Sequence, residues 1–173
     1  MTPERSDCCR AAEKRTATDC AHFFAGFFVA LAGPVLRQYG ADGERLLRSA
    51  LRDFGRARGA RIRQRVDALR LAPDVENFSK CYDFPMLPGF EATREITPER
   101  KTALISLCPL AEQWKNSGEA RLGLLYCEEV DAGIREGFSS EMIHMNLRNP
   151  LRGDRVCEQV DTLGEVGARD LSS

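Results

Sequence analysis

The sequence has almost no net charge and very little lysine. Lys and Arg together number 25 against 26 Asp and Glu, which gives a formal net charge of -1 at pH 7. This balance excludes a global electrostatic field able to hold nucleic acid or an anionic membrane, so we expect neither partner. The basic residues are almost all arginine, with lysine only at positions 14, 80, 101 and 115.

The sequence also lacks a long hydrophobic run. Its longest, residues 20–36, is shorter than the roughly 20 residues of a membrane-spanning helix and contains His22, two glycines and Pro34. We expect a buried helix there, with His22 in the core. The first residues do not resemble a secretory signal peptide, and the seven cysteines are an odd number. Both features predict a cytoplasmic protein whose cysteines are buried, bind a ligand or act as nucleophiles.

The strongest catalytic motifs are missing. The chain has no Gly-rich phosphate loop, nucleophile elbow, HExxH or paired CxxC. Its 173 residues suit one domain, which we place at residues 16–163 after a flexible lead-in (1–15) and before a tail (164–173).

The N-terminal half predicts two long helices. The first runs from Thr16 to about Tyr39, bends or restarts at Gly33-Pro34 and stops at Gly40, and the second covers residues 44–71. Gly55 and Gly59 lie on one face, four residues apart, which indicates a bend or the close approach of another backbone. Nine arginines between residues 45 and 70 are best explained as a solvated face paired with acids.

The C-terminal half predicts short strands around helices. We expect strands at residues 90–97, 101–107, 142–148 and 155–162, and helices at 111–115 and from 118 or 119 to 136, the last closed by Gly137. The fold class is therefore α+β, with N-terminal helices packed on a small antiparallel sheet that has an inserted helix.

Three cysteines of this half occupy positions that can carry chemistry. Cys108 ends a predicted strand, Cys127 lies inside a helix and Cys157 inside the last strand. Asp131 is four residues after Cys127, so both side chains project from one helix face. His144 and Asn146 alternate on one face of their strand and can share a pocket.

Three explanations of this set stay open. Cysteine is among the most buried residue types, so plain packing accounts for buried thiols. Cys108, Cys127, Cys157 and His144 form a reasonable tetrahedral set for zinc, although the short ligand spacings of zinc motifs are missing. Catalysis by a thiolate, or by a carboxylate with an imidazole, is the third.

Several stretches resemble the L-2-amino-thiazoline-4-carboxylic acid hydrolase family. The resemblance covers about residues 43–162 and is clearest in LCPLAEQW (107–114), GLLYCEEVD (123–131) and LRGDRVC (151–157), with FGRARG (54–59) and ENF (76–78) upstream. Glu158 departs from the aromatic or aliphatic residue that family members carry after the last cysteine. The end of the chain also looks like small ligand-binding domains of the vinyl-reductase type.

The resemblance implies a hydrolase, on a bacterial biosynthetic or catabolic route, that opens a cyclic amidine or another small S/N heterocycle at a carbon-nitrogen or carbon-sulfur bond. The alternative is a non-catalytic ligand- or metal-binding domain of the vinyl-reductase type. We expect a small-molecule substrate, possible zinc and a possible homo-oligomer. From residue type and position we assign as catalytic Cys108, Cys127, Asp131, His144 and Cys157, and as substrate-binding Trp114, Asn146, Arg148 and Arg152.

Overall fold

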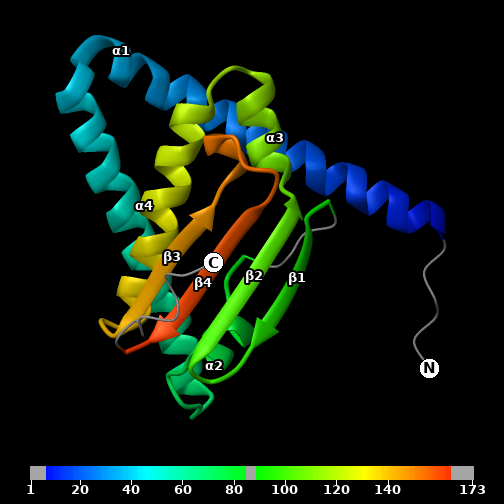
Figure 1. The fold of residues 1–173 in the computed structure, drawn as a ribbon, viewed down its shortest axis with the longest axis vertical. Coiled ribbons are helices and arrows are strands. Elements are labelled where there is room, and N and C mark those ends of the chain that lie inside the picture. The colour runs from blue at the N-terminus through cyan, green and yellow to red at the C-terminus, as the bar shows by residue number, and fades with distance from the viewer. Residues whose placement is uncertain (1–6, 85–88, 165–173) are drawn as a thin grey trace.

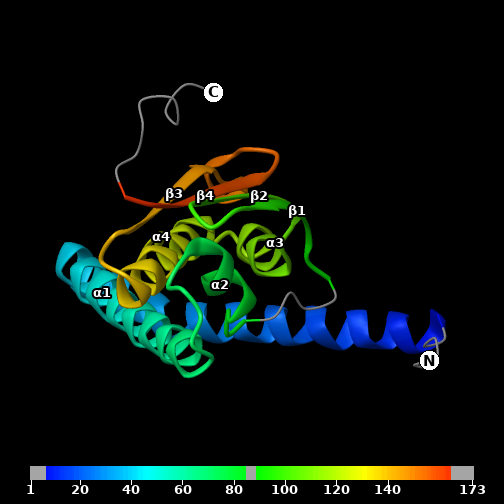
Figure 2. The same ribbon diagram turned by 90° about the horizontal axis from the view of Figure 1, so that it is seen from below.

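The computed structural model describes residues 7–84 and 89–164 and arranges all its helices on one side of a four-stranded sheet (Figures 1 and 2). The α+β architecture expected from the sequence is therefore confirmed. The elements in chain order are α1 (Asp7–Ala68), α2 (Val75–Lys80), β1 (Glu91–Ile96), β2 (Arg100–Leu107), α3 (Pro109–Asn116), α4 (Ala120–Phe138), β3 (Met142–Arg148), the 3-10 helix η1 (Pro150–Arg152) and β4 (Cys157–Leu163).

The sheet has the strand order β1-β2-β4-β3, and every neighbouring pair is antiparallel. The four predicted strands are confirmed, and β3 has the predicted bounds. The register of β4 pairs Cys157 with Ile105, Gln159 with Ala103, and Asp161 with Lys101. Because side chains alternate along a strand, these residues share one face, which looks toward the helices.

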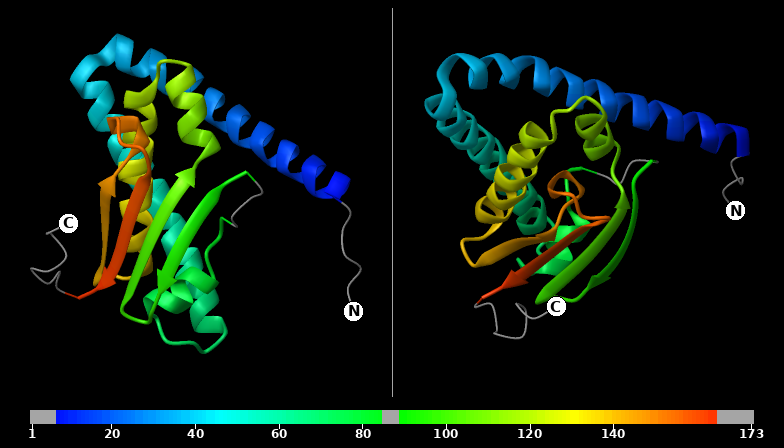
Figure 3. Two further views of the ribbon diagram at one scale, coloured as in Figure 1. Left: turned by 45° about the vertical axis from the view of Figure 1, so that its right-hand side comes forward. Right: turned by 45° about the horizontal axis from the view of Figure 1, so that its top comes forward.

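Helix α1 consists of two segments joined at Gly40, whose φ of 52° and ψ of -124° are not helical. The predicted stop at Gly40 is confirmed, whereas the chain stays helical through Pro34. The second segment returns beside α4 (Figures 1 and 3). The helix begins at Asp7, so the start expected near Thr16 is too late. Residues 1–6 of the expected lead-in and 165–173 of the expected tail lie outside the described residues.

The apolar run of residues 20–36 is helical but only one of its faces is buried. The buried face is built from small side chains, Ala21, Ala25 and Ala32, while Phe23 and Phe27 are 76% and 53% exposed. By length and composition this helix could cross a membrane, and 22% of its apolar window is buried. The expectation of a buried helix is wrong, because composition does not say how many sides of a helix are covered.

Helices α1 and α4 cross at their glycines. A Cβ atom added to Gly59 would lie 2.0 Å from the Ile134 carbonyl oxygen, and one added to Gly137 would lie 2.1 Å from the Arg56 carbonyl oxygen. The close backbone approach predicted at Gly55 and Gly59 is confirmed. Gly137 does not end α4, as expected from the sequence, but lies inside the helix where only glycine fits.

Replacing Gly59 by alanine should lower the free energy of unfolding by about 1–3 kcal/mol or more, because the added methyl group meets rigid backbone. Gly26→Ala is the matched control. A Cβ there meets nothing within 4 Å, so we expect stabilisation of about 1 kcal/mol from helix propensity. Urea denaturation followed by circular dichroism measures both, and equal stability of the two variants would contradict the crossing.

Ion pairs reinforce the same crossing. Arg52 bonds Glu129 through Nε at 2.8 Å and Glu136 through Nη1 at 2.7 Å, and Arg48 donates to Glu129 at 2.8 Å. Among the nine arginines of residues 45–70, acidic partners are found for Arg45, Arg48, Arg52, Arg56, Arg58 and Arg63. The interpretation of these arginines as a solvated face paired with acids holds for five of the six, whereas Arg58 is paired with Asp83 but buried.

Helix α2 was not predicted. Its start is fixed by Asp74, whose side chain accepts a 2.7 Å hydrogen bond from the backbone of Asn77. Its buried residues Val75 and Phe78 then join the core beneath the end of α1. This core cluster consists of Ile62, Val66, Val75, Phe78, Val130, Ile134, Phe138 and Met142.

Candidate functional site

A cavity of about 890 Å³ lies between α1, α4 and the inner face of the sheet. Its walls are largely apolar and include Phe24 and Phe54 of α1, Ile105 of β2, and Tyr126 and Val130 of α4. Cavities of about 300–1,000 Å³ with a few convergent polar groups are typical ligand sites. The polar groups here come mainly from α4 and β4.

Helix α4 and strand β4 supply these groups in three levels along the cavity: Cys127 with Cys157 in the first, Asp131 with Gln159 in the middle, and Arg135 with Asp161 in the last. Cys127, Asp131 and Arg135 follow each other at intervals of four residues on one face of α4. Opposite them, the inner face of β4 carries Cys157, Gln159 and Asp161. The middle and last levels are joined directly, since Gln159 Nε2 donates to Asp131 Oδ2 at 3.1 Å and Arg135 Nε donates to Asp161 Oδ1 at 2.9 Å. The cavity therefore runs from a thiol end to a charged end.

Asp161 is the centre of the charged end and is completely buried. Arg135 holds both of its oxygens, with a second bond from Nη2 at 3.0 Å. Lys101 Nζ donates to Oδ2 at 3.0 Å, and His144 Nδ1 lies 2.7 Å from Oδ1. Burial alone would raise the pKa of Asp161, but the charges of Arg135 and Lys101 and the His144 hydrogen bond hold this pKa well below its usual value.

Burial and the Asp161 charge shift the pKa values of Lys101 and Arg135 in different directions. Burial lowers the pKa of Lys101, although Asp161 opposes this shift. The guanidinium of Arg135 is almost completely buried, yet Asp161 keeps its pKa above the usual value. It lies 5.3 Å from the ring centre of Phe78. Lys101 lines the cavity and has one acidic partner for three N–H groups, so it has donors left for a ligand.

Asp131 lies in the middle level and lines the cavity. Arg135 Nη1 donates to its Oδ1 at 3.3 Å, and Gln159 holds the other oxygen. The second cavity-lining carboxylate, Asp83, is engaged by Arg58 through two bonds of 2.7 and 3.0 Å. Asp131 is thus oriented by two neighbours without being closed off by a bidentate arginine.

The thiol end brings together Cys108, Cys127 and Cys157, all of which line the cavity. Burial raises the pKa of each thiol, to about 12 for Cys157. The negative charge of Asp131 raises the pKa of all three further. At neutral pH these thiols are protonated.

We expect Cys127 to react with iodoacetamide at neutral pH at least tenfold more slowly than Cys20, because alkylation needs the thiolate. Cys20 is exposed and is the internal control within the same molecule. Peptide mass spectrometry after a timed reaction gives both rates. Equal rates would show that Cys127 is ionised and accessible in solution.

The other residues assigned from the sequence do not line the cavity. Trp114 is buried against Gly123 and donates to the Ala25 carbonyl at 3.2 Å. Arg148 pairs with Glu158 at 2.6 Å, and Arg152 pairs with Glu128 at 3.0 Å. His144 reaches the site only through Asp161. Asn146 stands next to His144 on the same face of β3, and its two amide atoms are buried without a partner in the described structure.

Zinc ligation finds no support in the geometry. Among the side chains that the structure describes (residues 15–84 and 89–164), no group of three or more His, Cys, Asp or Glu is arranged to hold a metal ion. The three cysteines and His144 do not form the tetrahedral set considered from the sequence, because His144 is bound to Asp161 at the other end of the cavity.

Sequence reasoning missed Lys101, Arg135, Gln159 and Asp161. The signal for Arg135 was present, since it continues the four-residue spacing of Cys127 and Asp131. Gln159 and Asp161 likewise continue the strand alternation that starts at Cys157. What the sequence did not contain was the register that places Lys101 beside Asp161.

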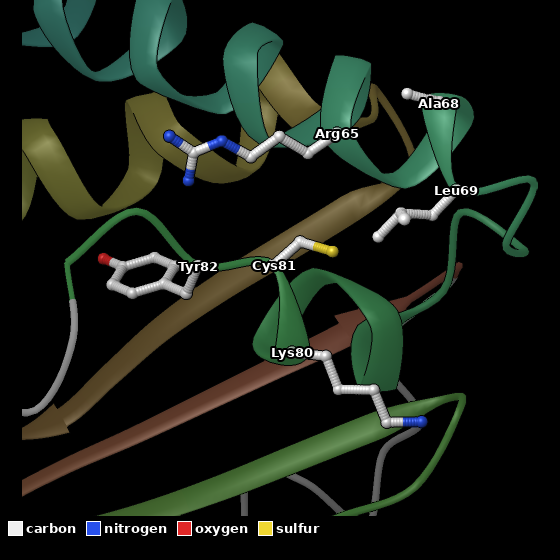
Figure 4. Close-up of a pocket in the computed structure, with 6 residues that line it drawn as sticks. All are labelled: Arg65, Ala68, Leu69, Lys80, Cys81 and Tyr82. Carbon is white, nitrogen blue, oxygen red and sulfur yellow. The ribbon is translucent and has the colours of Figure 1, made fainter.

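A second, more open hollow of about 410 Å³ lies where the end of α1 meets α2 (Figure 4). Leu69 and Cys81 face it, and Lys80 extends away to pair with Glu76 at 2.7 Å. No acid-base pair or buried charge among its described lining residues distinguishes it, so we place the functional site in the larger cavity.

Comparison with known proteins agrees with the resemblance seen in the sequence. The family model of L-2-amino-thiazoline-4-carboxylic acid hydrolase matches residues 20–159. The α+β domain with a largely apolar cavity beside its sheet is thus hydrolase-like in class, and the chain belongs to the L-2-amino-thiazoline-4-carboxylic acid hydrolase family. A search of curated proteins found no match.

A solved structure with a similar fold is a trafficking protein particle complex subunit 3 from Naegleria fowleri covalently bound to palmitic acid. The two share 17% sequence identity and superpose with a TM-score of 0.52, over 84% of this chain and 95% of that one. At this identity the likeness concerns the fold alone.

Proposed function

We propose that the cavity is the active site of a hydrolase that opens a small, carboxylate-bearing cyclic amidine or a related S/N heterocycle. The observation that carries the proposal is the position of Asp131. Its carboxylate faces the cavity between the thiol end and Lys101, and Arg135 and Gln159 fix its orientation. A fixed carboxylate inside an apolar cavity is suited to general base catalysis.

In the proposed reaction, water attacks the amidine carbon while Asp131 accepts one of its protons. As water adds, the amidine C=N electron pair moves to the nitrogen. The tetrahedral intermediate then collapses: its hydroxyl oxygen becomes the carbonyl oxygen and its proton passes through solvent to the amidine nitrogen, while the carbon-nitrogen or carbon-sulfur bond breaks and Asp131 returns its proton to the leaving atom. Lys101 binds the substrate carboxylate. Its partner Asp161 and the Gln159 that holds Asp131 are two residues apart on β4, about 7 Å along the strand, so the base and the cation lie on adjacent levels of the cavity.

The first experiment is incubation of the purified chain with L-2-amino-thiazoline-4-carboxylate and detection of the ring-opened product by liquid chromatography. Lys101→Met should raise KM by about 10- to 100-fold with a smaller change in kcat, because a charged contact to the substrate is lost. Lys115→Met, at an exposed lysine of α3, is the control and should behave like the wild type. No turnover by the wild type, or an unchanged KM in Lys101→Met, would refute this assignment.

A non-catalytic ligand-binding domain is the second candidate. It is favoured by the apolar walls, by three protonated thiols and by a volume well beyond that of one thiazoline ring. The fold neighbour that holds palmitic acid suggests an acyl chain as the ligand. Equilibrium binding of palmitate separates the candidates, since saturable binding without turnover supports this second function and turnover without binding supports the hydrolase.

A further inference from the structure

The first segment of α1 carries an apolar stripe on the face that points away from the rest of the fold. We call it the outer patch, formed by Phe23, Phe27, Ala30, Leu31 and Pro34, all of them exposed. The phenylalanine rings are parallel, with centroids 6.4 Å apart. Figure 2 shows the sheet, α3 and α4 together on one side of this segment. The buried alanines face that side, so the outer patch faces solvent.

The outer patch is comparable in area to the largest apolar patches of ordinary monomers, which are often functional. With about 200 Å² for a phenylalanine side chain, Phe23 and Phe27 at 76% and 53% exposure present on the order of 250 Å². Leu31, 58% exposed, extends this area. Contiguous apolar patches beyond a few hundred Å² are rare on monomers and mark interaction sites.

The charges at the two ends of the patch identify its partner. Asp19 precedes the patch and Arg37 follows it, and both are exposed without a hydrogen bond or ion pair to any other described residue. They are 18 residues apart, which is five full turns at about 3.6 residues per turn, so they lie along the same edge of the helix. The patch thus has opposite charges at its two ends.

We propose that the outer patch binds the outer patch of a second copy of this chain, with the two helices antiparallel. A two-fold axis at Phe28 places Asp19 of each copy opposite Arg37 of the other, because residues on the same flank meet in antiparallel helix pairs and charged flanks set helix orientation. A parallel pair would not join these opposite charges. Adsorption to an anionic lipid surface needs a cluster of basic residues beside the patch, and the exposed Arg15 and Arg37 with Asp19 leave an excess of only one positive charge.

The small residues of this face fit the same arrangement. The two-fold axis puts Gly26 level with Ala30 of the second copy. A Cβ at Gly26 would meet nothing within 4 Å, so the space beside this backbone is open. The helices can therefore approach closely enough for Phe27 to pack across the partner helix. One helix face is smaller than the roughly 800 Å² per partner of a standard interface, so we expect a reversible monomer–dimer equilibrium.

Sedimentation velocity over a range of protein concentrations tests the proposal. The wild type should show a reversible dimer. Phe27→Asp should raise the dimer Kd at least tenfold, since it buries a charge at the centre of the patch. Leu46→Asp, at an exposed leucine in the other segment of α1, is the matched control and should leave the Kd unchanged.

Exchanging the charges of Asp19 and Arg37 tests the antiparallel orientation without changing the apolar side chains of the outer patch. Asp19→Arg alone should raise the Kd about 3- to 10-fold, because two like-charge contacts replace two ion pairs in each dimer. Adding Arg37→Asp should restore the Kd to near the wild-type value. A monomer at every concentration, a dimer insensitive to Phe27→Asp, or no rescue by the double exchange would overturn the proposal. So would patch-dependent binding to phosphatidylglycerol vesicles by a chain that stays monomeric.

Discussion

Replacing Asp161 by asparagine should lower the free energy of unfolding by about 3–5 kcal/mol. Asp161 is completely buried, and its carboxylate is the acidic partner of both Arg135 and Lys101 at distances of 2.9–3.0 Å. Asparagine keeps the shape but leaves these two buried cations without their counter-charge. In a chain of this size, that loss corresponds to a fall in Tm of roughly 10 °C.

Urea denaturation monitored by circular dichroism measures this loss. Asp67→Asn is the matched control, because Asp67 is an exposed aspartate paired with Arg63 at 2.9 Å. Its effect should stay within about 0.5 kcal/mol. A similar small effect of Asp161→Asn would show that the buried cluster does not hold these charges in solution.

The same residue predicts a pH dependence of stability. The folded-state pKa of Asp161 lies well below its usual value, so the folded state binds its proton less readily than the unfolded state. This contribution to stability is therefore fully present above about pH 4, the ordinary aspartate pKa, and is lost as the pH falls through the folded-state pKa. The stability difference between wild type and Asp161→Asn should narrow over this acidic range.

The sequence predicted which residues each helix and strand contributes to this site better than it predicted which of those residues contact one another. Helical spacing placed Cys127 and Asp131 on one face, because this periodicity is local. Cys157 was predicted only to lie inside the last strand, and the structure shows that it faces the cavity. The pairing of Lys101 with Asp161 depends on the register between strands about 60 residues apart, which no local pattern encodes. His144 was selected for its chemistry, and its actual partner depends on the same register.

For the glycines and the apolar run, too, the sequence predicted the local structure but not the neighbouring element. The spacing of Gly55 and Gly59 predicted a close contact, but only the structure identifies α4 as the neighbour and Gly137 as part of the contact. The apolar run at residues 20–36 predicted a helix correctly. Whether Phe27 faces a core or solvent depends on where α3 and α4 pack, and they cover the opposite face, which carries the buried alanines and the half-buried Phe28.

Asp131→Asn should reduce kcat by about 100- to 10,000-fold while KM changes little, because the amide keeps the shape of the side chain but cannot accept a proton from water. Glu128→Gln is the control on the same helix, since Glu128 pairs with Arg152 at 3.0 Å and does not line the cavity. It should keep kcat within about twofold of the wild type. Circular dichroism must show that both variants are folded.

Two further variants separate a general base from a thiol nucleophile. Gln159→Ala removes the 3.1 Å hydrogen bond that orients Asp131, and should lower kcat about tenfold without changing substrate binding. Cys127→Ala should leave kcat within severalfold, because burial keeps its thiol protonated. If Cys127→Ala abolishes turnover and Asp131→Asn does not, the nucleophile is the thiol, and Asp131 then only raises the pKa of a group that must ionise to react.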